Sequence, residues 1–391
     1  MQVRILKYLS VSLFLFVLGC KKTENELQPQ KTYLVSATLV KEFTKDELIA
    51  ALGQAGPQFA LLVKNGVKQY KIVYNTTNTD GTTVKASGAL IVPVLATAAP
   101  MLSYQHGTIF DDSDAPSYLT TTSSEGQTAT LLASFGYIIS APDYIGYGVS
   151  NNLPHPYEHR EGLATASLDM LRAAKETITS QKINWNNNLY VAGYSEGGYA
   201  TMSLQKKIEE TTGTEFNLKA ASSGAGAYNK TLSFKNLVST KSSGVATHNA
   251  SYIWVLLTYD RIYKFNRPMN TYFVEPYATQ IQAQKQNARI VGSFDSLLTT
   301  AVKKGITDGT ETALLAAVTD NDVFDWKPKT PTRLYHGDKD TYVPYVNSVT
   351  AADAMKKRGA DVELVTVPGG DHGTSISNFF LGTLTFFESK K

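Results

Sequence analysis

The chain has 391 residues, and its 37 lysine and arginine side chains nearly balance 34 aspartate and glutamate side chains, which gives a formal net charge of +3. A balance so close to neutral, without a basic stripe, argues against nucleic acid as a partner. The length suits one large α/β domain with an insertion, or two domains. The sequence lacks His-Glu-x-x-His, cysteine clusters and acid-rich calcium loops, so we expect neither a metal nor another cofactor.

The first 19 residues have the pattern of an export signal. Arg4 and Lys7 form a short positive region, and an apolar run follows from 9 to 18. This run is too short to span a bilayer as a helix and is typical of a secretory signal. Cleavage after residue 19 would remove these two basic residues and no acid, which lowers the net charge from +3 to +1.

Cys20 is the single cysteine of the chain, so an intramolecular disulfide is excluded. It follows a glycine at the end of the apolar run, an arrangement that resembles a bacterial lipobox. The resemblance implies cleavage before Cys20, acylation of its thiol and amine, and anchoring to the cell envelope, where the outer membrane is the expected site. The alternative is an ordinary signal peptide with a fortuitous cysteine. Residues 20–31 are polar and are expected to form a flexible tether.

Beyond the tether, short apolar strands alternate with amphipathic helices. The first two strands are joined through Asp80-Gly81, a dipeptide that favours a hairpin turn. In chain order, we expect a helix at 45–52, strands at 68–75, 84–94 and 101–105, a helix at 125–135, a strand at 137–141, a helix at 161–179, a strand at 189–193, a helix at 199–209, a strand at 218–222, then a strand at 332–336, a helix at 346–358, a strand at 362–367 and a helix at 375–387.

A hairpin followed by alternating strands and helices indicates an α/β fold, with a mostly parallel sheet and helices on both faces. The alternation stops near residue 228 and resumes near 332, and the pattern between them is mostly helical. We therefore expect a core of residues 32–227 and 329–391, with a helical cap inserted at 228–328. Right-handed crossovers would bring the loops at the carboxyl ends of the strands together.

The segment 188–198 reads as a strand, a tight turn and the start of a helix, and its turn is Gly193-Tyr-Ser195-Glu-Gly197. Such a G-x-S-x-G turn presents a serine hydroxyl at the tip of a strand, next to a helix N-terminus. Glycines are expected at both ends, because the two backbone segments approach too closely for a Cβ. Ser195 is therefore the candidate nucleophile.

A serine hydroxyl needs a base to accept its proton, and that base needs an orienting group. His372 lies in a segment that directly follows an expected strand, and so does Asp340. The chain order Ser195, Asp340, His372 is the order of the α/β-hydrolase triad. Asp338 is the alternative acid, but we assign it to shaping the turn.

The other histidines are weaker candidates for the base. His106 and His336 each precede a glycine in a turn, where an imidazole more often braces a loop. His155 and His159 lie in a segment rich in proline and tyrosine that we expect at the surface. The carboxyl group of Asp143 is expected to tie its own loop.

Together these segments resemble the α/β-hydrolase superfamily, over nearly all of residues 65–390. Within it, the chain is similar to secreted lipases and esterases that carry a large cap after the sixth strand. The likeness rests on the two triad segments and on two further motifs, Ser103-Tyr-Gln-His-Gly-Thr108 and Pro142-Asp-Tyr-Ile-Gly-Tyr-Gly148. It implies an α/β-hydrolase fold and ester hydrolysis.

Acyl transfer also needs hydrogen-bond donors for the oxyanion of the tetrahedral intermediate. One expected donor is the backbone N–H of Glu196, which follows the nucleophile at a helix N-terminus. The second is expected from the loop after the third strand, at Thr108, with Gly107 as the alternative. The carboxyl group of Glu196 must point away from the oxyanion, because like charges repel.

The expected cap is rich in aromatic side chains between residues 252 and 277, and several of them are candidates to line an apolar pocket over Ser195. An equally simple interpretation is that most of them form the core of the cap. These aromatic side chains are Tyr252, Trp254, Tyr259, Tyr263, Phe265, Tyr272, Phe273 and Tyr277.

The favoured function is hydrolysis of carboxylic esters of apolar or aromatic acids, with membrane attachment through acylated Cys20. Two alternatives remain: a serine peptidase of the prolyl-oligopeptidase type, and a ligand-binding lipoprotein without catalysis.

Overall fold

The computed structural model describes residues 32–55, 61–120 and 123–391. The expected signal (1–19), Cys20 and the expected tether (20–31) lie outside the described residues. Within the described part, no helix is both long and apolar enough to cross a bilayer.

The core is a nine-stranded sheet with the order β1-β2-β3-β5-β4-β6-β7-β8-β9 among the described residues. The pairs from β1 to β3, and β3 with β5, are antiparallel, while every pair from β5 to β9 is parallel. This confirms the expected α/β fold with a mostly parallel sheet. The strands are β1 Leu34–Phe43, β2 Val67–Thr77, β3 Thr83–Pro93, β4 Ala99–Gln105, β5 Ile138–Pro142, β6 Trp185–Tyr194, β7 Asn217–Gly224, β8 Thr332–Gly337 and β9 Val362–Val367.

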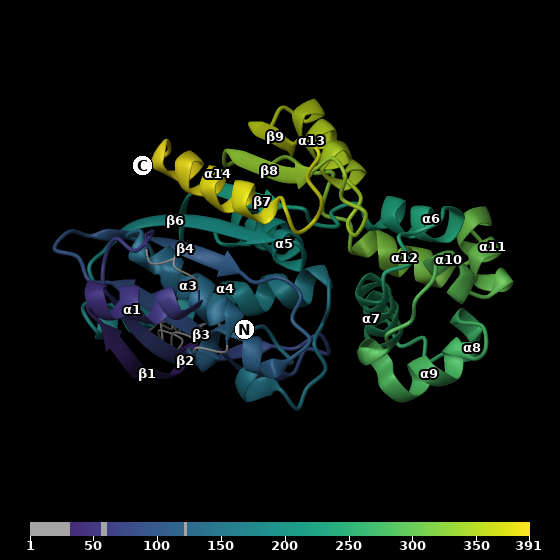
Figure 1. Ribbon diagram of the computed structural model, residues 1–391, viewed down its shortest axis with the longest axis horizontal. Helices are drawn as coiled ribbons and strands as arrows, with labels where there is room; N and C mark the ends of the chain where they lie inside the picture. The colour runs from purple at the N-terminus through teal and green to yellow at the C-terminus, as the bar shows by residue number, and fades with distance from the viewer. Residues whose placement is uncertain (1–31, 56–60, 121–122) are drawn as a thin grey trace, which may run out of the picture. The chain divides into compact units, whose positions relative to one another are not determined.

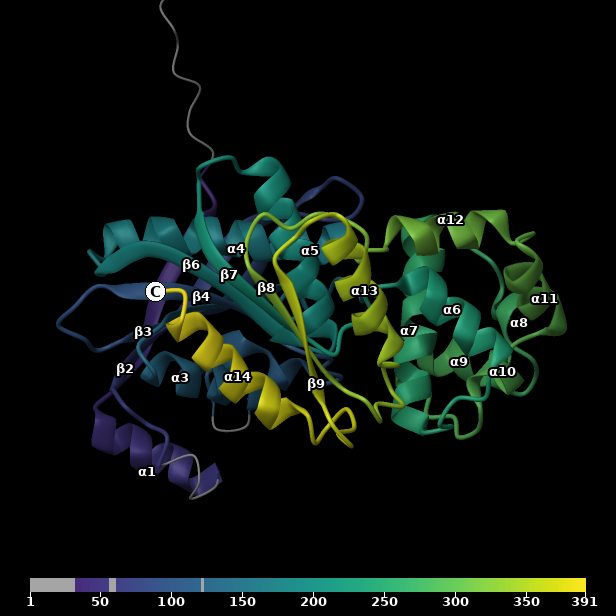
Figure 2. The ribbon, with the colours of Figure 1, turned by 90° about the horizontal axis from the view of Figure 1, so that it is seen from above.

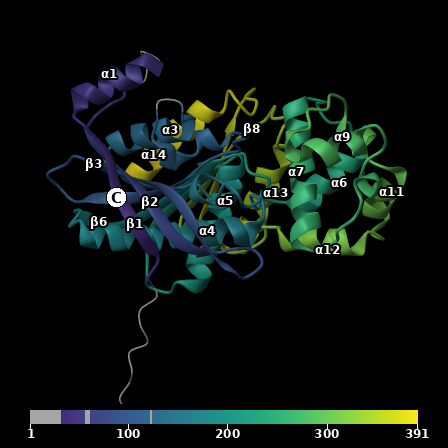
Figure 3. The ribbon, with the colours of Figure 1, turned by 90° about the horizontal axis from the view of Figure 1, so that it is seen from below.

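Helices cover both faces of the sheet, as Figures 2 and 3 show. Helices α3 and α14 pack on one face and α4, α5 and α13 on the other, and each layer buries its own apolar cluster against the strands. Alternate side chains of β4 divide between the two layers, Leu102 with the first and Met101 with the second. The helices around the sheet are α1 Lys45–Ala55, α3 Ser124–Ser134, α4 Arg160–Ser180, α5 Glu196–Thr211, α13 Val346–Lys357 and α14 Ile376–Glu388.

Strand β1 was missed by the sequence analysis. It pairs along the outer edge of β2, and seven of its ten residues are exposed. An edge strand with so little burial shows no clear alternation of apolar and polar side chains. One consequence is that the long helical insertion follows the seventh strand of the sheet and not the sixth.

The chain between β7 and β8 is helical, as its pattern predicted. Seven α-helices of this part pack around their own apolar cluster, whose members include Trp254, Tyr259 and Phe273. Figure 1 shows these helices grouped together, coloured from teal to green, to one side of the sheet. They are α6 Lys230–Ser239, α7 Ala246–Ile262, α8 Met269–Tyr272, α9 Tyr277–Gln284, α10 Phe294–Leu297, α11 Thr300–Asp308 and α12 Thr312–Asp320.

Candidate active site

Ser195 stands in the tight turn between β6 and α5, with a backbone φ of 60° and ψ of −124°. A positive φ is costly for a residue with a side chain and is typical of functional sites. The turn depends on its glycines: a Cβ on Gly197 would lie 2.1 Å from the carbonyl oxygen of Gln105, and one on Gly193 would lie 2.4 Å from the carbonyl oxygen of Gly197. Close packing of β4, β6 and α5 therefore requires glycine at both positions.

The structure brings Ser195, His372 and Asp340 together from the ends of three strands. The Nε2 of His372 lies 2.9 Å from the Oγ of Ser195, and its Nδ1 lies 2.6 Å from the Oδ2 of Asp340. The hydroxyl of Tyr194 donates to the backbone carbonyl of His372 and holds that loop in place. With Nδ1–H donated to the carboxylate, Nε2 is free to accept the proton of the serine hydroxyl.

Asp340 is buried and held on both carboxylate oxygens. Its Oδ1 accepts the backbone N–H groups of Tyr342 and Val343, each at 2.9 Å, and the Nε2 of His336 lies 3.2 Å from its Oδ2. Burial opposes ionisation, but the hydrogen bonds from His336 and His372 outweigh it and hold the pKa of Asp340 well below its ordinary value. The group that faces His372 is therefore a carboxylate at neutral pH.

The two neighbouring aspartates shape turns. Asp338 accepts the backbone N–H of Gly369 at 2.8 Å, and Asp371 accepts those of Gly373 and Thr374. Neither carboxyl group contacts His372 in these interactions, whereas that of Asp340 does.

The expected oxyanion segment lies beside the nucleophile. A Cβ on Gly107 would be 3.9 Å from the Cβ of Ser195. The hydroxyl of Thr108 is paired with that of Tyr157 at 2.8 Å, and the ring of His106 bridges the carbonyl oxygens of Gly107 and Asp143. These contacts fix the loop after β4 against its neighbours, and His106 braces it as expected.

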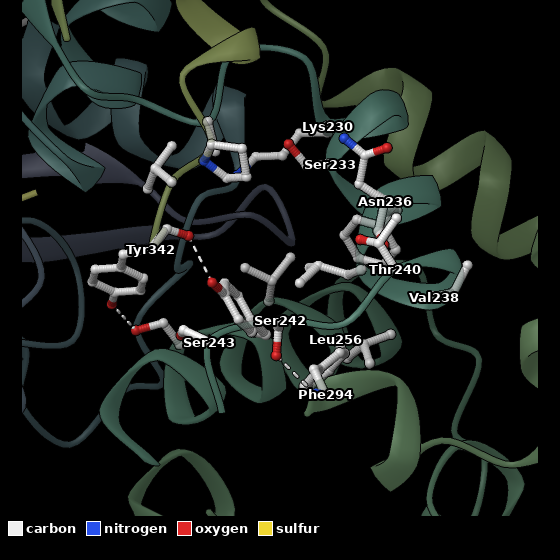
Figure 4. A pocket seen from close by; sticks show the side chains of 18 of the residues that line it. Lys230, Ser233, Asn236, Val238, Thr240, Ser242, Ser243, Leu256, Phe294 and Tyr342 are labelled. Carbon is white, nitrogen blue, oxygen red and sulfur yellow. Dashed lines mark hydrogen bonds between the residues drawn. The ribbon is translucent and has the colours of Figure 1, made fainter. Parts of the chain in front are cut away.

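Above Ser195 there is a cavity of about 400 Å³, lined by Ser195 itself and by residues of helices α6, α7, α10 and α11. Figure 4 shows its side chains converging from the helical insertion, with Lys230 and Ser233 at one end and Phe294 and Leu256 at the other. The apolar lining comes from Phe234, Leu237, Val238, Val255, Leu256, Phe294, Leu298, Val302 and Ile306.

Of the aromatic side chains expected over Ser195, Tyr252 lines this cavity. Four others, Trp254, Tyr259, Tyr272 and Phe273, are buried in the insertion's own cluster, and Tyr263, Phe265 and Tyr277 pack against it. The simpler interpretation of these aromatics therefore holds for most of them. The other aromatic lining residues are Tyr157, Phe234, Phe294 and Tyr342, which lie outside the stretch that the sequence singled out.

The secretory lipase family matches residues 114–383, which is more than half of the chain. The chain belongs to the secretory lipase family. It is an α/β-hydrolase and a carboxylic ester hydrolase, and membership of a secretory family indicates export.

Solved structures share this fold. A Legionella pneumophila protein described as a candidate hydrolase is 26% identical to this chain, with a TM-score of 0.79 over 91% of this chain and 98% of that chain. The rice cell wall degrading esterase LipA from Xanthomonas oryzae is 24% identical, with a TM-score of 0.77 over 91% and 96% of the two chains. Candida antarctica lipase A in its closed state shares the fold, with 17% identity and a TM-score of 0.64 over 93% and 85%. No curated protein sequence matches the chain.

The lipase also differs from expectation at His155 and His159, which are buried and not at the surface. The Nε2 of His155 lies 2.7 Å from a carboxyl oxygen of Glu196, and the Nδ1 of His159 accepts the N–H of Gly162 at the start of α4. Tyr157, which lies between them, stacks on Trp254 of the helical insertion, a contact that the sequence alone does not reveal. The carboxyl group of Glu196 is thus turned into the protein, as expected.

A buried ion pair, Lys230 with Glu158, also lines the cavity of the lipase next to Ser195. Burial lowers the pKa of Lys230 and raises that of Glu158, and their mutual attraction opposes both effects. Glu158 has a φ of 48°, a strained conformation for this residue. Sequence reasoning missed this pair, because a lysine and a glutamate 72 positions apart carry no local pattern. Among the described residues, no cluster of potential metal ligands occurs.

Proposed function

We propose that this lipase hydrolyses carboxylic esters of apolar or aromatic acids through a triad of Ser195, His372 and Asp340. The observation that carries the proposal is the unbroken hydrogen-bond chain from the Ser195 hydroxyl through His372 to Asp340, at the mouth of an apolar cavity. A carboxylate, an imidazole and a serine in that order supply a nucleophile, its base and the group that orients the base.

In the first half of the reaction, His372 takes the proton of Ser195 as the hydroxyl attacks the ester carbonyl. The tetrahedral intermediate collapses, His372 gives the proton to the leaving alcohol, and an acyl-enzyme remains on Ser195. Water, deprotonated by the same imidazole, then attacks the acyl group and releases the acid. Asp340 stays ionised and stabilises the imidazolium in both halves.

The oxyanion is stabilised by backbone N–H groups of Glu196 and Thr108, with Gly107 as the neighbouring alternative. The N–H of Glu196 is the first of helix α5, where such groups have no partner within the helix. The contact between the hydroxyls of Thr108 and Tyr157 supports the assignment of Thr108, because it anchors that residue beside the nucleophile turn.

The acyl group occupies the cavity within the helical insertion. Most of its lining surface is apolar, although many of its lining residues are polar, and its volume of about 400 Å³ falls in the range of small-ligand sites. The proposed organisation is a catalytic core of residues 32–227 and 329–391 with a cap of residues 228–328. The proposed location is the cell envelope, with attachment to the outer membrane through acylated Cys20.

The proposal is tested with p-nitrophenyl esters from acetate to palmitate, offered to residues 21–391. We expect Ser195→Ala to lower kcat by roughly 10⁴-fold or more. A fluorophosphonate probe should label the unmodified protein and not this variant. Cleavage of peptide substrates with no ester hydrolysis would favour the peptidase alternative and overturn the proposal.

A further inference from the structure

His155 and Glu196 form a buried pair that the proposed reaction does not use. Their side chains are 2% and 0% exposed, and the Nε2 of His155 lies 2.7 Å from the Oε1 of Glu196. Glu196 directly follows the nucleophile and carries a proposed oxyanion donor on its backbone. A contact that holds the side chain of Glu196 therefore also holds the first turn of α5.

The segment 155–159 contacts the other parts of the site as well. The hydroxyl of Tyr157 holds that of Thr108, and the ring of Tyr157 stacks on Trp254 of the helical insertion, with centroids 4.4 Å apart and planes 6° apart. Glu158 pairs with Lys230. One short segment thus contacts the loop after β4, helix α5 and two helices of the insertion.

The hydrogen bonds of His155 fix the number of protons in the pair. Its Nδ1 lies 2.7 Å from the carbonyl oxygen of Ile145, which can only accept, so Nδ1 carries a hydrogen. If the ring is neutral, Nε2 is an acceptor and Glu196 must be the protonated donor. If the ring is protonated, Nε2 donates to a carboxylate. In both cases the pair holds one proton more than a neutral imidazole beside a carboxylate, and its net charge is zero.

The surroundings require this neutrality. The second oxygen of Glu196, Oε2, has no hydrogen-bond partner within the described part of the chain, and an unpaired buried carboxylate is strongly unfavourable. Charged groups near the pair are the Glu158–Lys230 pair, the buried carboxyl group of Glu125, and the guanidinium of Arg261, which donates to the backbone carbonyl of His155. Packing leaves His155 little freedom: a Cβ on Gly146 would lie 2.6 Å from its backbone N.

We propose that His155 is a positioning residue for the oxyanion hole, and the proposal rests on the proposed function. By sharing a proton with Glu196, it cancels a negative charge on the residue whose backbone carries a proposed oxyanion donor. The same hydrogen bond fixes the first turn of α5, and with it the direction of the Glu196 backbone N–H. Coulomb repulsion in such a buried site is much stronger than in water.

The test compares His155→Ala with the double variant His155→Ala/Glu196→Gln in the otherwise unchanged enzyme. The single change leaves an unpaired carboxylate, and we expect kcat to fall by about 10²-fold with little change in KM, as for loss of an oxyanion donor. The double variant lacks that charge but still lacks the hydrogen bond from residue 155. We therefore expect its kcat to be about tenfold higher than that of the single variant. The affinity for an alkyl boronic acid, which forms a tetrahedral adduct on Ser195, should follow kcat across the set.

Two further variants separate this role from general stability. His155→Gln keeps most of the volume and a donor for Glu196 but no shared proton, so it should fold if His155→Ala does not, and it should still lower kcat by about tenfold. Leu204→Ala removes a buried side chain of the same helix in a cluster without site residues. It should lower Tm while leaving kcat unchanged.

The outcomes distinguish the two proposals. If the enzyme is active and neither His155→Ala nor His155→Gln changes its kcat or boronate affinity, the proposed role of His155 is wrong and the proposed function stands. The same holds if the double variant is no better than the single variant. An unmodified enzyme without Ser195-dependent ester hydrolysis would overturn the proposed function together with it.

Discussion

The hydroxyl of Tyr252, on helix α7 of the insertion, donates a 2.6 Å hydrogen bond to the backbone carbonyl oxygen of Tyr342. Tyr342 follows Asp340 by two residues, and its own N–H donates to that carboxylate. The helical insertion is therefore bonded directly to the loop that carries the acid of the proposed triad, so changes in the insertion should reach the chemistry.

The first prediction concerns this bond. Tyr252→Phe removes one hydrogen bond and leaves a carbonyl without its partner, which should cost about 1–3 kcal/mol of unfolding free energy. We also expect kcat/KM for esters to fall, because the Asp340 loop is less firmly held. Urea denaturation and steady-state kinetics measure the two effects. Tyr263→Phe is the matched control, since its hydroxyl contacts Asp320, away from the cavity; equal kinetic losses in both variants would contradict the account.

The second prediction concerns Asp340 and activity. Asp340→Asn should keep the shape of the site but remove the charge that stabilises the His372 imidazolium and that selects its tautomer. We expect kcat to fall by roughly 10³–10⁴-fold with a smaller change in KM. Asp338→Asn is the control, because that carboxylate accepts a backbone N–H in the turn. A larger loss in the Asp338 variant would move the acid role to that residue.

The third prediction is a pH dependence of stability. The folded pKa of Asp340 lies well below its ordinary value because hydrogen bonds from His336 and His372 outweigh the effect of burial. A lowered carboxyl pKa contributes stability that is fully present above the unfolded pKa of about 4 and is lost as the pH falls toward the folded pKa. The difference in Tm between the unmodified protein and Asp340→Asn should therefore shrink below about pH 4. A difference that stays constant with falling pH would show that the carboxylate is not specifically stabilised.

The fold was largely predictable from the sequence because the parallel strands are buried and their helices are amphipathic. The three proposed triad residues could be found because each lies in a recognisable turn after a strand. Residues such as Lys230 and His155 could not, since their importance depends on partners far along the chain. His155 looked like a surface residue because its neighbours are proline and tyrosine, and only packing against helix α7 shows that the segment is buried.

The fourth prediction concerns the buried pair in the cavity wall. Lys230→Ala would leave Glu158 buried without its partner, and such a loss costs about 3–5 kcal/mol of unfolding free energy. Replacing both residues by neutral ones of similar size, Lys230→Met with Glu158→Gln, should restore much of that stability. Urea denaturation of the three proteins measures this. If the double variant is no more stable than Lys230→Ala, the unpaired charge is not the cause.

The fifth prediction concerns the acyl pocket. Val302 lines the cavity from helix α11, and Val302→Phe should narrow it. Each methylene of an acyl chain gains about 1–3 kcal/mol in a fitting apolar pocket, so kcat/KM for long-chain esters should fall at least tenfold more than for short ones. Val318→Phe changes a residue buried in the same cluster but outside the cavity lining. It should lower stability without shifting the chain-length preference; an equal shift in both variants would place the acyl chain elsewhere.

The most direct test of the account is hydrolysis of the p-nitrophenyl ester series by residues 21–391 and by Ser195→Ala. The account predicts ester hydrolysis with a measurable chain-length optimum, and its loss in the variant while Tm is kept. A folded protein that hydrolyses none of these esters, or a Ser195→Ala variant as active as the unmodified protein, would contradict it.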